Sequence, residues 1–203
     1  SENYGFAEGY NKAIKQTQYK YTILLNSDVE VTEDWTRPLL DFMRRNSDVG
    51  ALQPKIRSWK ERTKFEYAGA AGGFIDYLGY PFCRGRILSY VEEDGGQYND
   101  RRDIFWASGA AMCCRREVFE SLGGFDEDFF AHMEEIDLQW RMQLAGWRIV
   151  VEPKSVVYHL GGGTLPASSR KIFLNHRNNL AMLFKCASPM QRAVVAVVRP
   201  ATD

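Results

Sequence analysis

The chain has 203 residues, of which 45% are hydrophobic, and its 26 basic and 26 acidic side chains cancel. This length suits a single domain with a sizeable core. The balanced charge argues against a nucleic-acid partner. No run of 18 apolar residues occurs in the sequence, which argues against a membrane-spanning helix.

Helix-like and strand-like segments alternate along the chain. We expect helices at residues 9–18, 33–46, 116–122, 168–185 and 190–198, and strands at 21–25, 49–53, 104–114, 147–151 and 155–158. Thr32 is expected to cap the second helix and Pro54 to end the second strand. Residues 55–103 are rich in glycine and indicate loops. The alternation predicts an α/β fold with a mainly parallel sheet flanked by helices.

The cysteines indicate structural thiols. Cys83, Cys113, Cys114 and Cys186 lack C-x-x-C spacing, so we expect buried free thiols in a reducing cytoplasm rather than a zinc site. Cys113 and Cys114 are neighbours in a predicted strand. Because successive side chains of a strand alternate, these two should point to opposite faces of the sheet.

Three carboxylates, Glu134, Glu135 and Asp137, stand at the start of a predicted amphipathic helix. Free N–H groups and the helix dipole stabilise negative charge at such a position. A carboxylate held there, directly after aromatic residues, is a candidate general base. The alternative is that these residues cap the helix and that Asp137 forms an ion pair with Arg141 one turn later.

Two predicted strands end in candidate metal ligands. One apolar strand ends in His159, which a glycine run follows at residues 161–163, and another runs through Asn26 into Asp28. Open α/β sheets bind ligands at the carboxyl ends of their strands, and imidazole and carboxylate groups bind metals. A structural histidine and an ordinary turn at Asp28 are the alternatives.

Two further segments could bind ligands or partners. Residues 74–86 combine aromatic side chains, which stack on sugar rings, with Arg84 and Arg86, which can hold phosphates. An ordered surface loop is the alternative. The apolar stretch 193–198 predicts packing against the core or a partner, with a membrane surface as the alternative.

Taken in order, these segments resemble the inverting glycosyltransferases of family 2, which have the GT-A fold. The matching segments are NYGFAEGYN (3–11), LLNSDVEV (24–31), WASGAAM (106–112), GGFDEDFF (123–130), the acidic pair 134–135, AGWRIV (145–150), the pair 158–159 and RNNL (177–180). The resemblance covers residues 1–186, which it identifies as a partial GT-A domain, and leaves 187–203 as a C-terminal helical extension.

The resemblance also implies what is missing. Family members open with a strand–helix–strand unit that holds the nucleotide, whereas this sequence begins directly at the N-x-G-F-A segment. We therefore expect an N-terminally truncated domain that binds its donor weakly. Because the truncation exposes an apolar face and a strand edge, we also expect self-association as a homo-oligomer, through the aromatic-rich segment 74–86 or the apolar stretch 193–198.

The implied reaction is transfer of a sugar from a nucleotide-sugar donor to a saccharide or lipid-linked acceptor, by single displacement with inversion. Glu135 takes the position of the general base, where the family more often has Asp, with Glu134 and Asp137 beside it. Asp28 and His159 take the positions that hold Mg²⁺ or Mn²⁺.

The remaining implied site residues contact the substrates. Trp106, Ser108 and Gly109 line the sugar and acceptor side, and Arg84 and Arg86 are further candidates for substrate binding. The resemblance implies a role in cell-envelope polysaccharide biosynthesis, in the cytoplasm at the inner face of the membrane, with peripheral membrane contact.

Two other functions were weighed. A non-catalytic fragment that binds carbohydrate or a partner is the alternative from a different class, but the retention of Glu135, Asp28 and His159 argues against it. A glycoside hydrolase that uses Glu135 with a second carboxylate leaves His159 and its glycine run unexplained.

Overall fold

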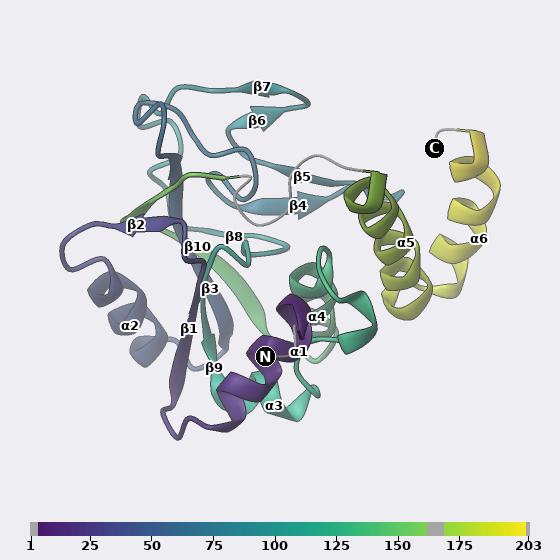
Figure 1. Cartoon of the computed structure of the whole chain (residues 1–203), viewed down its shortest axis with the longest axis horizontal. Coiled ribbons are helices and arrows are strands. Elements are labelled where there is room, and N and C mark those ends of the chain that lie inside the picture. The colour runs from purple at the N-terminus through teal and green to yellow at the C-terminus, as the bar shows by residue number, and fades with distance from the viewer. Residues whose placement is uncertain (1–3, 162–168, 202–203) are drawn as a thin grey trace.

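The computed structural model describes residues 4–161 and 169–201. Asn3, Ser168 and the glycine run beyond Gly161, to which the sequence patterns pointed, lie outside the described residues. A central sheet runs through the molecule, with helices on both sides of it (Figure 1). Its strand order is β1 (Tyr21–Leu25), β9 (Ala111–Arg115), β3 (Val49–Ser58), β10 (Arg148–His159) and β2 (Val29–Val31), and β8 (Arg102–Asp103) pairs with β10.

The predicted α/β class is confirmed, but the expectation of a mainly parallel sheet is wrong. Among the described strands of this sheet, β3 and β10 pair in parallel. The pairs β1–β9, β3–β9, β2–β10 and β8–β10 are antiparallel. Alternation of helices and strands sets strand direction only where a crossover links neighbouring strands. Here a long connection follows β3, and the chain returns to insert β9 between β1 and β3 in the opposite direction.

The two faces of the sheet carry separate clusters of apolar side chains. Leu39 and Met43 of α2 (Thr36–Arg45) pack with Cys113 on one face. Cys114 belongs to the cluster on the other face, where α1 (Gly5–Lys15), α3 (Arg116–Ser121) and α4 (Glu134–Leu144) lie. The alternation predicted for the two cysteines is therefore confirmed. All four cysteines are free and buried, also as expected.

Several element ends differ from the sequence-based expectation. Strand β3 continues through Pro54 to Ser58, because Pro54 lies beside a bulge in β10, where the ladder is irregular and its missing N–H is tolerated. The two short strands expected at 147–151 and 155–158 are one strand, β10, joined across that bulge. Thr32 does not cap α2, since its hydroxyl donates to the carbonyl of Val156 at 2.8 Å.

A second, smaller sheet occupies much of the segment that was expected to be loop. It is antiparallel and contains β4 (Gly73–Ile75), β5 (Pro81–Cys83), β6 (Arg86–Ile87) and β7 (Tyr90–Val91). The buried carboxylate of Asp94, which follows β7, accepts from Lys55 Nζ at 2.9 Å and also pairs with Arg57. Because both cations belong to β3, this buried ion pair fixes the small sheet to the large one.

The C-terminal part of the described chain is helical. Helix α5 (Ser169–Cys186) is followed by α6 (Pro189–Val198), which Ser188 caps, and by a short turn at Arg199–Ala201. Val195 packs in the cluster between α5 and the second sheet, whereas Val197 is 78% exposed. The expected packing of residues 193–198 therefore holds for one side of α6. No helix within the described ranges is both long and apolar enough to cross a bilayer.

Candidate active site

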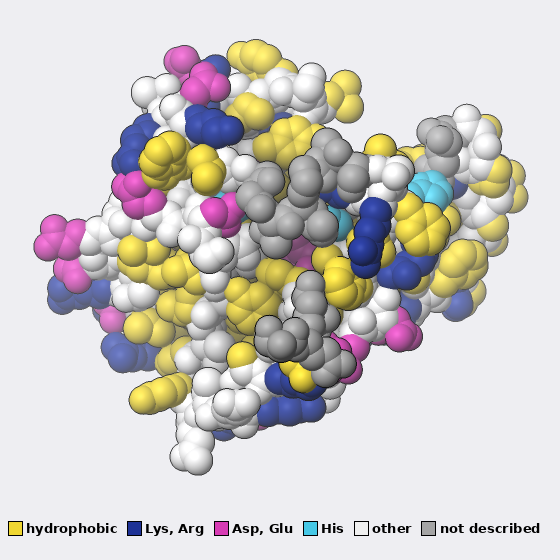
Figure 2. Space-filling model, in the orientation of Figure 1, with side chains coloured by type: hydrophobic (Ala, Val, Ile, Leu, Met, Phe, Trp, Pro, Cys, Tyr) yellow, Lys and Arg dark blue, Asp and Glu magenta, His cyan; other side chains and the backbone are white. Residues whose placement is uncertain are grey.

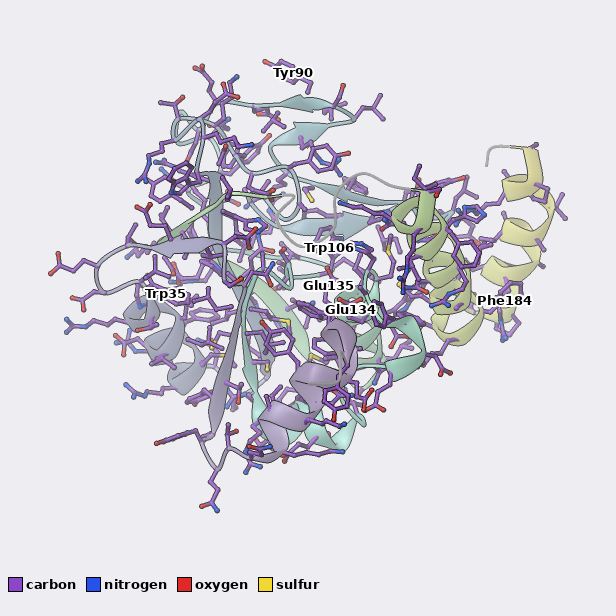
Figure 3. The ribbon with its side chains drawn as sticks, in the orientation of Figure 1. Trp35, Tyr90, Trp106, Glu134, Glu135 and Phe184 are labelled. Carbon is purple, nitrogen blue, oxygen red and sulfur yellow. The ribbon has the colours of Figure 1, made fainter. Side chains whose placement is uncertain are left out.

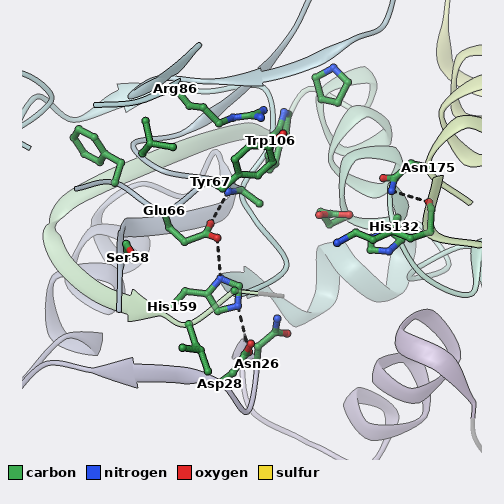
Figure 4. Close-up of a pocket in the computed structure, with 18 of the residues that line it drawn as sticks. Asn26, Asp28, Ser58, Glu66, Tyr67, Arg86, Trp106, His132, His159 and Asn175 are labelled. Atoms are coloured by element: carbon green, nitrogen blue, oxygen red, sulfur yellow. Dashed lines mark hydrogen bonds and ion pairs between the residues drawn. The ribbon is translucent and has the colours of Figure 1, made fainter. Parts of the chain in front are cut away.

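Two cavities, of about 880 and 560 Å³, share a wall at the carboxyl ends of the central strands. The residues that line both are Asn26, Ala68, His132, Glu135 and His159. The larger cavity, shown in Figure 4, extends toward the second sheet and the first turns of α5. The smaller one extends over α1 and residues 108–110. A group on the shared wall can thus reach ligands in both cavities.

The structure brings together the two predicted metal ligands in the larger cavity, where His159 lies on the shared wall and Asp28 lies beside it. Nε2 of His159 lies 3.2 Å from Oδ1 of Asp28, and Nδ1 lies 3.5 Å from Oε1 of the buried Glu66 (Figure 4). Burial opposes protonation of His159, but the carboxylates of Glu66 and Asp28 outweigh it and raise the pKa of the imidazole. Oδ2 of Asp28 is buried without a hydrogen-bond partner. Glu66 carried no signal in the sequence that would have identified it.

Asp28, Glu66 and His159 do not form a complete metal site by themselves. Among the residues that the structure describes, no group of three or more His, Cys, Asp or Glu side chains has the geometry to hold a metal ion. The unpartnered Oδ2 of Asp28 and the imidazole of His159 nevertheless suit a divalent cation that takes its other ligands from a bound substrate.

Glu134 and Glu135 begin helix α4 and lie near the centre of the molecule, below Trp106 in Figure 3. Glu134 is only 4% exposed, and each carboxylate has a buried Oε2 without a partner. Burial, and the charge of Glu135, raise the pKa of Glu134 well above its ordinary value. Burial also raises the pKa of Glu135, but its own N–H and those of Gly109 and Ile136 oppose the shift. These N–H groups favour the carboxylate form of Glu135.

The turn before these glutamates has an unusual backbone. Phe130, His132 and Met133 have φ angles of 61°, 72° and 71°. Non-glycine residues rarely adopt such angles, because each one costs on the order of 1–3 kcal/mol and persists only where the surrounding structure imposes it. Strain of this kind concentrates at functional sites, and here it aims His132 at both cavities.

Contacts from distant segments hold this strained turn. Nδ2 of Asn178, in α5, donates to the carbonyls of Phe129, Ala131 and His132 at 3.0, 2.9 and 2.7 Å. The N–H of Phe6, in α1, donates to the carbonyl of Phe130 at 2.9 Å. The segments NYGFAEGYN and RNNL thus meet at the turn that places Glu135. Sequence reasoning found both segments but missed the positions of His132 and Asn178.

Residues 106–110 are not the strand that we expected, because two glutamine side chains take the place of a neighbouring strand. Gln139 bonds both the N–H and the carbonyl of Ala107, at 2.6 and 2.7 Å, and Gln53 accepts from the N–H of Ser108 at 2.7 Å. A side chain at Gly109 would bring its Cβ to 3.1 Å from Cζ of Phe6. The same Cβ would lie 3.8 Å from Cβ of Glu135, so the absence of a side chain lets the segment pack closely against Phe6 and Glu135. Ser108 and Gly109 line the smaller cavity.

Of the other predicted site residues, Trp106 and Arg86 line a cavity, whereas Arg84 and Asp137 do not. Trp106 and Arg86 line the larger cavity. Arg84 lines neither cavity, and its guanidinium pairs with Asp100 at 2.9 Å. Asp137 is fully buried and lines neither cavity.

Asp137 instead forms ion pairs with two cationic side chains. Its Oδ2 lies 2.7 Å from Nη2 of Arg141 and 3.1 Å from Nζ of Lys185. The ion pair with Arg141, weighed from the sequence as the alternative, is confirmed for this residue. Asp137 therefore links α4 to α5, and we assign it no part in the chemistry.

Residues 1–178 match the family described as "Glycosyltransferase like family 2". The chain belongs to this glycosyltransferase family. Over 143 residues it is 32% identical to the N-acetylglucosaminyl-diphospho-decaprenol L-rhamnosyltransferase of Mycobacterium tuberculosis, covering 68% of this chain and 46% of that protein. Over 150 residues it is 32% identical to the O-antigen biosynthesis protein RfbC of Myxococcus xanthus, covering 73% and 12%. The chain thus spans less than half the length of either relative.

Solved structures confirm the GT-A fold of this glycosyltransferase domain. GalNAc-T7, solved with UDP, GalNAc and Mn²⁺, superposes with a TM-score of 0.61 at 16% identity, over 89% of this chain and 34% of that chain. The mannosyltransferase PcManGT of Pyrobaculum calidifontis, solved with GDP-Man and Mn²⁺, gives a TM-score of 0.56 at 13% identity, over 97% and 49%. At such identities the likeness shows the fold alone.

Proposed function

We propose that this domain transfers a sugar, with inversion, from a nucleotide-sugar donor to a saccharide or lipid-linked acceptor in the synthesis of a cell-envelope polysaccharide. The observation that carries the proposal is the position of Glu135 on the wall between two cavities. A carboxylate there can take a proton from an acceptor in one cavity as it attacks a donor in the other. The names of the relatives, which describe a rhamnosyltransferase and O-antigen biosynthesis, support the same class of product.

We assign the donor sugar to the smaller cavity, its diphosphate to the cation ligands Asp28 and His159 where the larger cavity meets it, and the acceptor to the rest of the larger cavity. Gly5, Gly9, Ser108 and Gly109 in the lining of the smaller cavity let a ligand approach the backbone closely, and Phe6, Tyr10 and Phe130 also line it. The larger cavity is lined by Tyr67 and Trp106, along with Phe65, and such aromatic faces suit the ring of an acceptor sugar.

Glu135 acts in this proposal as the general base. Its carboxylate takes the proton of the acceptor hydroxyl while the hydroxyl oxygen forms a bond to the anomeric carbon. The bond from that carbon to the nucleoside diphosphate breaks at the same time, so one displacement inverts the configuration. The raised pKa of Glu135 makes it a stronger base than an ordinary carboxylate. Burial and the charge of Glu135 raise the pKa of Glu134, which opposes a second buried charge beside the base.

Asp28 and His159 would hold a divalent cation, Mg²⁺ or Mn²⁺. When bound, the ion supplies stabilisation of the negative charge on the departing diphosphate. Glu66 fixes the ring of His159 from the opposite side, as carboxylates commonly do for histidine ligands of metals. The solved structures that share the fold contain Mn²⁺, which supports the cation without deciding between the two metals.

A product analysis tests this proposal directly. The protein is incubated with a panel of nucleotide-sugars, with and without saccharide and lipid-linked acceptors, and nucleotide release is measured. Acceptor-dependent release, with a product of inverted anomeric configuration by NMR, is the expected result. A product with retained configuration would overturn the single displacement and with it the role of Glu135.

A further inference from the structure

His132 lines both cavities, and the reaction proposed above does not use it. Its Nε2 is buried and has no hydrogen-bond partner among the residues that the structure describes. A buried polar atom that lacks a partner costs free energy, and such atoms are few in native proteins. Glu135, on the same wall, also has a buried Oε2 without a described partner. Two unsatisfied groups therefore stand where the donor and the acceptor would meet.

The imidazole of His132 lies beside α5, on the side of the larger cavity. Lys171, Ile172 and Asn175 of α5 line the larger cavity, and none of these three lines the smaller one. The charge of Lys171 acts on the imidazole, and His132 and Asn175 lie on the same side of the cavity in Figure 4. A ligand that bonds Nε2 of His132 therefore belongs with the contents of the larger cavity, to which we assign the acceptor.

The surroundings of His132 favour its neutral form. Burial and the charge of Lys171 lower the pKa of the imidazole. Cζ of Arg170 lies 5.2 Å from the centroid of the Phe130 ring, and Figure 2 shows basic side chains over α5, right of centre in the view. A neutral imidazole has one donor and one acceptor nitrogen. A sugar hydroxyl both donates and accepts, so it can bond Nε2 in either tautomer, whereas a fully ionised phosphate only accepts.

The backbone at His132 offers a rival explanation for a histidine at this position. Its φ angle is 72°, and histidine, asparagine and aspartate adopt positive φ more readily than other non-glycine residues do. Asparagine would serve such a turn at least as well as histidine, but its side chain ends near the position of Nδ1. A role for Nε2 therefore distinguishes substrate binding from support of the turn.

We propose that Nε2 of His132 binds a second hydroxyl of the acceptor sugar while Glu135 takes the proton of the first. The imidazole neither gains nor loses a proton in the reaction, and its bond fixes which hydroxyl faces Glu135. The contact thus selects acceptors that carry a hydroxyl at the position next to His132. This assignment rests on the proposed function and deepens it by naming a residue that determines the choice of acceptor.

NMR of the histidine side chains tests the contact without requiring turnover. The chain has three histidines, and the imidazole signals of His132 are assigned by their loss in His132→Gln. Wild-type protein is titrated with the methyl glycosides of glucose, galactose, mannose and N-acetylglucosamine, and separately with UDP. We expect at least one glycoside to shift the signals of His132 and UDP to leave them in place. A shift caused by UDP, or no shift with any glycoside, would overturn the assignment.

Two amide variants separate binding from support of the turn. The side chain of glutamine ends near the position of Nε2, whereas asparagine falls short of it but tolerates positive φ better. We expect His132→Gln to keep glycoside affinity close to that of wild type. His132→Asn should lose affinity by about 3- to 10-fold, the scale of one hydrogen bond, although its unfolding midpoint is no lower than that of His132→Gln. Equal glycoside affinity in wild type and His132→Asn, or equal losses in both variants, would show that His132 serves the turn alone.

Deoxy sugars identify the hydroxyl that His132 binds. The monodeoxy derivatives of the tightest-binding glycoside are titrated against wild type and His132→Asn. We expect one derivative to bind wild type as weakly as the parent glycoside binds His132→Asn, and to lose nothing further in the variant, because both changes remove the same bond. If every derivative loses equally in both proteins, His132 binds none of the hydroxyls. Acceptor-dependent nucleotide release by wild type is measured separately, so that the proposed function can stand when the assignment of His132 fails.

Discussion

Oδ1 of Asp28 lies 3.2 Å from Nε2 of His159, although 131 residues separate them in the chain. The antiparallel pairing of β2 with β10 produces this contact, because it sets His159 opposite Val29, directly after Asp28. The N–H of Leu160 also donates to the carbonyl of Asp28 at 3.0 Å. The fold thus brings Asp28 and His159 into the larger cavity, which Glu135 also lines.

Replacement of either strand-end residue should abolish metal-dependent binding of a nucleoside diphosphate. Asp28→Ala and His159→Ala each remove a ligand from the proposed cation site. Calorimetry with UDP, with and without Mn²⁺, should show that Mn²⁺ tightens binding in wild type but not in either variant. Asp41→Ala, in a half-exposed residue of α2 that lines neither cavity, serves as the control. Equal Mn²⁺ dependence in all four proteins would remove Asp28 and His159 from the cation site.

Glu134→Gln should stabilise the protein at neutral pH. The native pKa of Glu134 is raised, so the folded state binds a proton more tightly than the unfolded state does. Stability is therefore lost as pH rises from the ordinary carboxyl pKa, about 4.3, through the raised native value. Glutamine removes this loss. The Tm difference from wild type should be largest at neutral pH and shrink toward pH 4.

Glu117→Gln is the matched control, since Glu117 is an exposed glutamate in the first turn of α3. Its Tm difference from wild type should be small at every pH. A Glu134→Gln advantage that grows as the pH falls has the wrong sign for this account and would show that Glu134 is stabilised as a carboxylate.

Asp137→Ala should damage the fold rather than the chemistry alone. Removing one partner of a buried ion pair leaves Arg141 uncompensated and costs about 3–5 kcal/mol. Urea unfolding should show this loss, whereas Glu120→Ala, which breaks the exposed i,i+4 pair with Arg116, should cost no more than about 0.5 kcal/mol. If Asp137→Ala unfolds like wild type but loses transfer, Asp137 belongs to the reaction after all.

Asn178→Ala should displace Glu135 through the strained turn. Three carbonyls lose the hydrogen bond from Asn178, which is expected to lower stability by about 1–3 kcal/mol. Because the burial of Glu135 also changes, the acid limb of the pH profile of kcat/KM should shift, which a purely structural loss would not cause. If Asn178→Ala lowers the stability but leaves the pH profile of kcat/KM unchanged, Asn178 supports the fold alone.

The sequence predicted those site features that are local along the chain. Asp28, Glu135 and His159 each lie next to an element end that the patterns of apolar residues mark, and all three line the larger cavity. The α/β class follows from the same alternation. The family resemblance supplied the order of the segments, and the match of residues 1–178 confirms the family.

The features that sequence reasoning missed depend on contacts across long separations. Asn178 acts on a turn more than 40 residues away, and Gln139 bonds the backbone of Ala107 in place of a neighbouring strand. Neither role has a periodic signal. Arg84 and Arg86 look equivalent in sequence, but an ion pair with Asp100 removes only Arg84 from the cavity. Strand direction was also missed, because it depends on where the chain returns after the second sheet.

The central claim is that Glu135 is the base, and Glu135→Gln tests it most directly. Glutamine keeps the shape of the side chain but takes up no proton. With an active donor and acceptor pair, we predict that kcat falls about 10²-fold or more. Donor affinity and the unfolding midpoint should stay close to those of wild type. Near-normal transfer by Glu135→Gln would contradict the account and make another group on the shared wall the base.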